Sequence, residues 1–306
     1  MMIAYGTILA TLMGLAFGSF LNVCLSRWPK GESVVKPRSH CCNCGHTLAW
    51  WENLPLVSWL ALRGRCRQCK AWIGWRYPLV ELAVGALWGW QAWQFVSLAV
   101  NNAQIPGLIT LPDVVTLLGR MIFYWLLVAL AVLDAEHLWL PNWLTLPGIA
   151  LGFAYSIILG FGLLKSDALT GLPMTEGVLA EPFGVWSLLV KSLIGAAVGG
   201  GLVLVIRWTY RLLRGHEGMG LGDAKLMAML GAWLGLPGAL LAFALAVLLG
   251  AAASLALLAV PAARRGAQRW TMTKLPLGTF LCIGGVLSAL WGRQIIAAYL
   301  RWVGLN

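Results

Sequence analysis

The sequence carries too little charge for a water-soluble protein. Only 11% of its 306 residues are Asp, Glu, Lys or Arg, whereas a soluble domain has about 25%, and 60% of the residues are hydrophobic. So few charged side chains could not cover a surface that faces water. An ordinary soluble enzyme or binding domain is therefore excluded, and much of the surface is expected to face lipid.

Charge is absent altogether from several long stretches. The first, from Ile3 to Leu25, is too long for the core of a signal peptide and follows no basic residues, so we interpret it as a retained helix. Similar apolar runs of roughly 20 residues recur, which is the length that spans a bilayer core. We therefore expect an all-α polytopic membrane protein with about eight transmembrane helices. Their expected ranges are 3–25, 79–99, 114–133, 142–163, 186–208, 223–236, 238–260 and 276–300.

Acidic residues are also scarce. There are 11 of them against 22 Lys and Arg, which gives a formal net charge of +11. In a soluble protein this excess would favour nucleic acid as a partner. In a membrane protein, basic residues mark the cytoplasmic loops and contact anionic lipids. We therefore expect membrane lipids, and no nucleic acid, as the partners of these residues.

The basic residues also predict the orientation of the chain. Three segments, 27–76, 207–225 and 264–274, hold 17 of the 22 basic residues. With eight crossings all three segments fall on one side of the membrane, which is then the cytoplasm. The acidic loop 164–185 falls on the other side, and both termini are expected outside.

A cytoplasmic lobe, residues 27–78, separates a first transmembrane helix (1–26) from the remaining membrane domain (79–306). At about 50 residues the lobe is too small for a large hydrophobic core, and domains of this size usually need a metal, disulfides or docking. It contains two Cys-x-x-Cys pairs, which together can wrap one tetrahedral Zn²⁺. A closed four-thiolate site leaves no position for water, so this zinc would be structural. The expected ligands are Cys41, Cys44, Cys66 and Cys69.

Other interpretations of the cysteines remain open. They could form two disulfides or a redox dithiol, although the reducing cytoplasm disfavours structural disulfides. His40 or His46, which flank the first pair, could replace one thiolate, whereas Cys42 is expected to be a spectator. Structural zinc on four cysteines is the interpretation that we favour.

Two aspartates stand at the ends of expected membrane helices, where an ionisable group is costly and suggests a function. Asp134 follows the apolar run 121–133, and Asp223 follows closely spaced glycines. The expected topology places both at cytoplasmic helix ends, at similar depth. Two carboxylates that face each other cannot both ionise easily, so one can act as an acid and the other as a base that activates water. Such a pair would hydrolyse a peptide without a metal or a covalent intermediate.

Each aspartate also has an interpretation without catalysis. Asp134 could be an interfacial residue at a helix end, and Asp223 could be the N-cap of a helix that starts at Ala224. The pair could instead couple ion movement in a transporter or channel, although no repeat symmetry is visible and a four-thiolate insert is not expected there. A third possible class of function is a non-catalytic assembly factor whose zinc lobe binds a partner.

Several motifs follow one another along nearly the whole chain. They are Gly18-Ser19-Phe20-Leu21-Asn22-Val23, the four-cysteine segment, Trp51-Glu52-Asn53-Leu54-Pro55-Leu56-Val57-Ser58-Trp59-Leu60, Arg76-Tyr77-Pro78-Leu79-Val80-Glu81, Asp134 before Leu140-Pro141-Asn142, Gly218-Met219-Gly220-Leu221-Gly222-Asp223-Ala224-Lys225-Leu226, and Leu275-Pro276-Leu277-Gly278-Thr279-Phe280. In this order they resemble the type IV prepilin peptidases. Gly-x-Gly-Asp alone is shared with presenilin-type proteases, but the cysteine insert makes the resemblance specific.

This resemblance implies a bifunctional leader peptidase and N-methyltransferase of the bacterial inner membrane, with Asp134 and Asp223 as the catalytic aspartates. The substrate would be a prepilin, or a pseudopilin of type II secretion, whose short basic leader ends in Gly. Cleavage on the cytoplasmic side would precede methylation of the new α-amino group by S-adenosylmethionine. No donor-binding motif is recognisable, so the resemblance alone assigns the methyl-donor site to the lobe region. Its candidate residues are Glu52, Gly64, Arg76, Tyr77 and Glu81.

Two departures from the family's pattern are visible. Many members have Pro after the first zinc cysteine, where this chain has Cys42. The last motif usually reads Pro-Phe-Gly-Pro, whereas this chain has Pro276-Leu277-Gly278-Thr279. The second departure lies near the expected active site and bears on substrate fit.

Overall fold

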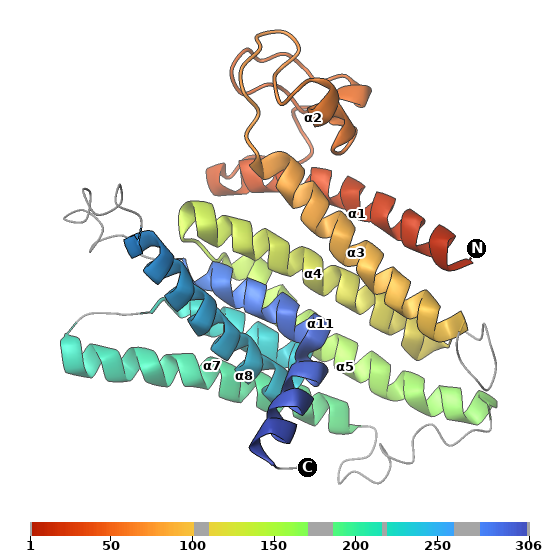
Figure 1. Cartoon of the computed structure of the whole chain (residues 1–306), viewed down its shortest axis with the longest axis vertical. Coiled ribbons are helices and arrows are strands. Elements are labelled where there is room, and N and C mark those ends of the chain that lie inside the picture. Colours follow the sequence, from red (N-terminus) through yellow and green to blue (C-terminus); the bar gives the residue numbers. More distant parts are fainter. Residues whose placement is uncertain (1, 101–109, 171–185, 216–218, 260–275, 305–306) are drawn as a thin grey trace. The chain divides into compact units, whose positions relative to one another are not determined.

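The computed structural model is helical and describes residues 2–100, 110–170, 186–215, 219–259 and 276–304 (Figure 1). Within these ranges there is no β-strand, only two isolated bridges in the lobe. The expectation of an all-α protein is therefore confirmed. The long helices are α1 (Met2–Arg27), α3 (Arg76–Val100), α4 (Leu111–His137), α5 (Asn142–Thr170), α7 (Ser187–Arg214), α8 (Leu221–Ala259) and α11 (Leu277–Val303).

Eight expected spans correspond to these seven helices because α8 contains two of the spans. Gly235, in the middle of its 39 residues, has φ 68° and ψ −179°, and Pro237 follows shortly after. Glycine tolerates this conformation and proline removes a helical hydrogen bond, so the helix is interrupted there. The break falls at the boundary expected between 223–236 and 238–260.

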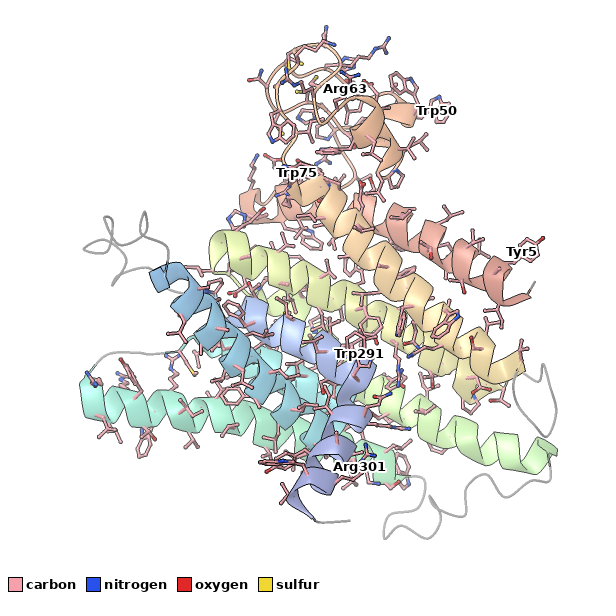
Figure 2. All side chains as sticks on the ribbon, in the orientation of Figure 1. Tyr5, Trp50, Arg63, Trp75, Trp291 and Arg301 are labelled. Carbon is pink, nitrogen blue, oxygen red and sulfur yellow. The ribbon has the colours of Figure 1, made fainter. Side chains whose placement is uncertain are left out.

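The helices have the length and surface of membrane spans. Within the described ranges, six are long and apolar enough to cross a bilayer, namely all of the long helices except α3. Large apolar side chains cover their exposed sides, such as Leu12 on α1, Val205 on α7 and Leu248 on α8. Aromatic side chains project near helix ends, as Figure 2 shows for Tyr5. The chain is therefore a multi-pass membrane protein.

Several helices extend past the expected apolar ranges. α7 continues beyond residue 208 to Arg214, where Gly215 adopts a left-handed conformation and ends it. Asp134 consequently lies within the last turn of α4, and Leu138, at φ 49°, marks the end of that helix. The basic segment 264–274, most of the acidic loop 164–185 and the motif residues Gly218 and Leu275 lie outside the described residues.

The chain divides into two compact units, Met1–Ala129 and Leu130–Asn306. In the first unit α1 and α3 pack side by side, and the lobe connects them (Figure 1). A Cβ atom added at Gly14 would lie 2.9 Å from Gly85 Cα, and one at Gly18 would lie 2.7 Å from Glu81 Cα. Small residues of this kind let membrane helices pack backbone to backbone. Besides its loops, the lobe contains two short helices, η2 (Trp50–Asn53) and α2 (Val57–Ala61).

The second unit is organised around α8, which packs against α5, α7 and α11. Close approach again depends on glycine, because a Cβ atom added at Gly195 of α7 would lie 2.5 Å from the carbonyl oxygen of Gly231 on α8. This unit also contains the last turn of α4. It therefore brings together the starts of α8 and α11 and the end of α4, which carry the residues described next.

Candidate active site and metal centre

The carboxyl group of Asp134 lies against the first turn of α11. Asp134 is buried, and its Oδ2 accepts a hydrogen bond from the backbone N–H of Thr279 at 2.7 Å. The Thr279 hydroxyl lies 3.2 Å from the same oxygen. Only glycine fits at position 278, because a Cβ atom there would lie 2.8 Å from Asp134 Cγ. The start of α11 therefore encloses one side of this carboxyl group.

Asp223 lies in the first turn of α8 and is also buried. Its Oδ2 accepts a hydrogen bond from the backbone N–H of Gly220 at 3.1 Å. Because α8 begins at Leu221, Asp223 occupies the third helical position, and the N-cap is Gly220 rather than Asp223. An acidic side chain that reaches back in this way forms half of a capping box. The side chain of Asp223 thus stabilises the N-terminal end of α8, and its carboxyl group stays buried there.

The second unit brings the two aspartates into one site. Leu140 lies between the two helix starts, since a Cβ atom at Gly222 would be 3.0 Å from Leu140 Cβ and one at Gly278 would be 3.0 Å from Leu140 Cδ1. The carboxyl group of Asp134 is close enough to Asp223 for their charges to interact. Two buried carboxyl groups whose charges repel do not both ionise easily, so one of them can serve as an acid while the other serves as a base.

The four predicted cysteine ligands come together in the lobe. Their Sγ atoms all lie within 4.8 Å of one another, with 3.8 Å between Cys41 and Cys69 and 4.0 Å between Cys44 and Cys66. Four sulfurs bound about 2.3 Å from a tetrahedral Zn²⁺ would lie about 3.8 Å apart. Disulfide sulfurs would be about 2.05 Å apart, and all four thiols are free. The cluster therefore fits one tetrahedral metal ion rather than two disulfides.

Both cysteine pairs lie on tight loops of the same design. In the first loop the N–H of Gly45 donates to the carbonyl of Cys41 at 2.9 Å, and in the second the N–H of Lys70 donates to the carbonyl of Cys66 at 3.0 Å. Gly45 and Lys70 occupy equivalent positions, with φ of 71° and 57°. A residue with positive φ therefore closes each loop, and Lys70 adopts at its position a conformation that is easier for glycine.

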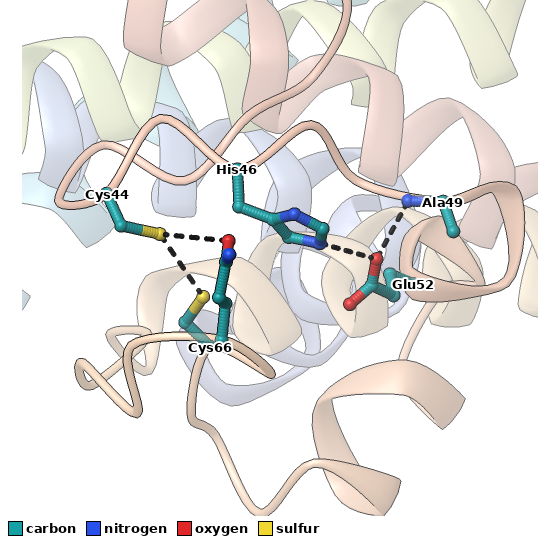
Figure 3. Close-up of polar contacts among 6 residues, drawn as sticks. Cys44, His46, Ala49, Glu52 and Cys66 are labelled. Atoms are coloured by element: carbon teal, nitrogen blue, oxygen red, sulfur yellow. Dashed lines mark hydrogen bonds and ion pairs between the residues drawn. The ribbon is translucent and has the colours of Figure 1, made fainter.

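Neither flanking histidine belongs to the cluster. His40 Nδ1 lies 3.0 Å from the carbonyl of Arg38, and His46 Nε2 lies 3.3 Å from a carboxyl oxygen of Glu52 (Figure 3). Cys42 is exposed and is not among the four clustered thiols.

The first unit contains a cavity of about 310 Å³ between the lobe and the neighbouring ends of α1 and α3. Three of the five candidate methyl-donor residues line it, namely Glu52, Tyr77 and Glu81. Arg76 does not, and instead donates to the hydroxyl of Ser26 at 2.8 Å. The structure therefore gathers part of the expected set around one cavity.

Glu52 is the best-defined polar group of this cavity. Its side chain is 1% exposed, and its Oε2 accepts a hydrogen bond from the N–H of Ala49 at 2.8 Å (Figure 3). That bond and the contact with His46 hold the pKa of the carboxyl group below its usual range. Within the described part of the chain, the Oε1 atom of Glu52 has no hydrogen-bond partner. A buried acceptor without a partner is costly, so Oε1 is available to accept a hydrogen bond from water or from a ligand.

A second buried acceptor of the same kind is Asn22 Oδ1, on α1. Asn22 lines the cavity, and its amide nitrogen donates to the carbonyl of Tyr77 at 2.9 Å. Asn22 and Thr279 are the two site residues that sequence reasoning missed. Each lies within a motif quoted above, and Thr279 also stands at the second departure from the family's pattern, which is the signal that could have identified it.

Gly64 has a structural role behind the wall of the cavity. Its φ is 67°, and a Cβ atom would lie 2.8 Å from the ring of Trp72 and 2.9 Å from that of Trp59. We expect Gly64→Ala to lower the stability of the lobe by about 1–3 kcal/mol, through backbone strain and overpacking. Chemical denaturation followed by tryptophan fluorescence measures this change. Gly74→Ala is the control, because its Cβ meets nothing within 4 Å. Equal stability of the two variants would contradict the role assigned to Gly64.

Comparison with known proteins places the chain in a family. The bacterial peptidase A24 N-terminal domain matches residues 12–95, and the type IV leader peptidase family matches residues 121–255. The prepilin leader peptidase/N-methyltransferase of Pseudomonas aeruginosa is 36% identical over 96% of this chain and 93% of its own length. That of Stutzerimonas stutzeri is 34% identical over 97% and 94%, and that of Aeromonas hydrophila is 34% identical over 95% and 93%. No solved structure matches the chain. Similarity of this extent, along both halves of the sequence, shows that the chain belongs to the type IV leader peptidase family.

Proposed function

We propose that this protein cleaves the leader peptide from type IV prepilins or type II secretion pseudopilins and then methylates the new N-terminal amine. The observation that carries the proposal is the buried pair of carboxyl groups at the end of α4 and the start of α8. The names of the similar proteins support both activities. Basic residues mark the cytoplasmic segments of a membrane protein, so we place the lobe and the two aspartates on the cytoplasmic side of the bacterial inner membrane.

Hydrolysis is assigned to Asp134 and Asp223, within the membrane domain 79–306. One ionised carboxylate removes a proton from water as the water oxygen attacks the carbonyl carbon of the scissile glycine. The other, protonated carboxyl group gives its proton to the amide nitrogen, and the C–N bond breaks. The apolar surroundings at both helix ends favour a pair that holds one proton, because they disfavour two adjacent charges.

Zinc in the lobe, residues 27–78, is assigned a structural role. The four thiolates of Cys41, Cys44, Cys66 and Cys69 close the coordination shell and would fix the two loops relative to each other. These loops carry residues of the cavity wall, including Cys66 and Trp72. The metal would therefore shape the cavity without taking part in the chemistry.

Methyl transfer is assigned to the cavity of the first unit. Its volume of about 310 Å³ and its two unpartnered acceptors, Glu52 Oε1 and Asn22 Oδ1, fit a ligand that carries amino groups. S-adenosylmethionine, which has such groups, would supply an electrophilic methyl group when bound there. Glu81 supports the cavity wall, because its Oε2 accepts the N–H of Leu56 at 2.8 Å and holds that residue at φ 57°. Methylation needs a free α-amino group, so it follows cleavage.

Glu52→Gln is expected to separate the two activities. The substitution keeps the size of the side chain but removes the charge that faces a donated N–H, so we expect methylation to fall at least about tenfold. Cleavage, which is assigned to the aspartate pair of the second unit, should continue. Incubation of the purified variant with a prepilin and S-adenosylmethionine, followed by mass spectrometry, should show cleaved, unmethylated product. If cleavage falls as much as methylation does, the lobe only holds the leader and the assignment of methyl transfer to it is wrong.

A further inference from the structure

Thr279 connects the first turn of α11 to the last turn of α4 through three polar contacts. Its backbone N–H donates to Asp134 Oδ2 at 2.7 Å, and its hydroxyl oxygen lies 3.2 Å from that same atom. The hydroxyl also lies 3.0 Å from the carbonyl oxygen of Ala131, one turn earlier in α4. Thr279 stands where the last motif departs from its usual proline, a residue that has neither an N–H nor a hydroxyl.

These contacts treat the two oxygens of Asp134 differently. Both donors of Thr279 contact Oδ2. Hydrogen bonds to a carboxylate favour its ionised form and restrict the rotation of the carboxylate group. The backbone N–H of Gly278 also interacts with this carboxyl group, and Oδ1 is the oxygen that Thr279 leaves for a water molecule. Asp223 has weaker support of this kind, because the described residues give its carboxyl group one backbone donor, Gly220, at 3.1 Å.

The Thr279 hydroxyl has one proton and two acceptors within reach, Asp134 Oδ2 and the carbonyl of Ala131. While Asp134 is ionised, the hydroxyl can donate to Oδ2. When Asp134 has taken up a proton on Oδ1, Oδ2 still accepts the N–H of Thr279, and the hydroxyl can donate either to Oδ2 or to the carbonyl of Ala131. The residue can therefore satisfy Asp134 in both protonation states of a catalytic cycle.

We propose that Thr279 is a positioning residue that holds Asp134 as the base of peptide hydrolysis, which leaves Asp223 as the acid. A proton of the attacking water moves to Asp134 Oδ1, and the water oxygen bonds to the carbonyl carbon. Asp223 gives its proton to the leaving amide nitrogen as the C–N bond breaks. This inference rests on the proposed function, since it assumes that the aspartate pair cleaves the leader.

A graded series at position 279 tests the positioning role. Thr279→Ser keeps both donors and should retain kcat within about twofold, whereas Thr279→Val keeps only the N–H and should lower kcat about tenfold with KM unchanged. Ser288→Ala is the matched control, because it deletes another hydroxyl of α11, which donates to the carbonyl of Gly238. It should keep the kcat of the unmodified protein.

Chemical labelling tests the assignment of the base without relying on activity. An aliphatic epoxide alkylates an ionised carboxylate in preference to a carboxylic acid. Peptide mapping by mass spectrometry should find the label on Asp134 rather than Asp223, and less of it in the Thr279→Val variant. Label on Asp223, or Thr279→Val with the kcat of the unmodified protein, would overturn the inference. If Asp134→Asn still cleaved the leader, the proposed function itself would fail, which is a different result.

Discussion

Asp134→Asn and Asp223→Asn are each expected to abolish leader cleavage, with kcat lowered by at least about 10³-fold. Asparagine keeps the size of the side chain but can neither accept the proton of water nor donate one to the leaving amide. The two residues act as one unit, so the double variant should be little worse than either single variant. The measurement is the initial rate of prepilin cleavage by purified protein in detergent.

Asp113→Asn is the control for the loss of a carboxylate from α4. Asp113 lies in the first turn of that helix, where it accepts the N–H of Thr110 at 2.9 Å, and it takes no part in the proposed site. Its variant should cleave the leader at the normal rate. Substantial cleavage by the Asp134 or Asp223 variant at normal expression would refute the catalytic assignment.

Loss of zinc is expected to have the second largest effect. Purified protein should contain about one Zn²⁺ per chain, and Cys66→Ser should remove it, because three ligands cannot close a tetrahedral structural site. In a lobe of this size the binding energy of the metal contributes directly to folding, so the lobe should unfold when the metal leaves. Elemental analysis measures the metal, and protease sensitivity of residues 27–78 measures the folding of the lobe.

Cys42→Ser is the matched control for the zinc experiment. Cys42 lies beside a ligand in the sequence but is exposed and outside the cluster, so its variant should keep its zinc. Protein prepared without chelators and found free of metal would contradict the assignment. A Cys42 variant that lost its metal as Cys66→Ser does would show that the ligand set is wrong.

The helices could be predicted from the sequence because few backbone conformations satisfy their hydrogen bonds within lipid. An apolar run of about 20 residues must satisfy its own hydrogen bonds, and a helix does so within one segment. The helix ends were less predictable, because polar turns continue a helix into the headgroup region. Arg211 and Arg214, for example, extend α7 past its apolar part. The break in α8 could be placed because Gly235 and Pro237 leave a local signature.

The candidate site was predictable where its chemistry depends on residue type and spacing. Two Cys-x-x-Cys pairs indicate one tetrahedral site wherever they lie, and an aspartate at a membrane helix end stands out by its cost. Thr279 has no such signal, because its N–H reaches Asp134 across 145 positions in the sequence. Gly64 was selected as a methyl-donor candidate, whereas the structure places it behind Trp59 and Trp72, where it permits a turn.

One measurement tests the account as a whole: mass spectrometry of the substrate N-terminus after incubation with S-adenosylmethionine. It is carried out with intact and with pre-cleaved prepilin. The Asp134→Asn variant should leave the intact substrate unchanged but methylate the pre-cleaved one, while Glu52→Gln should give cleaved, unmethylated product. If the Asp134 variant fails to methylate the pre-cleaved substrate while it remains folded, or if it cleaves the intact one, then hydrolysis at the aspartate pair and methyl transfer at the lobe are not the separate reactions described here.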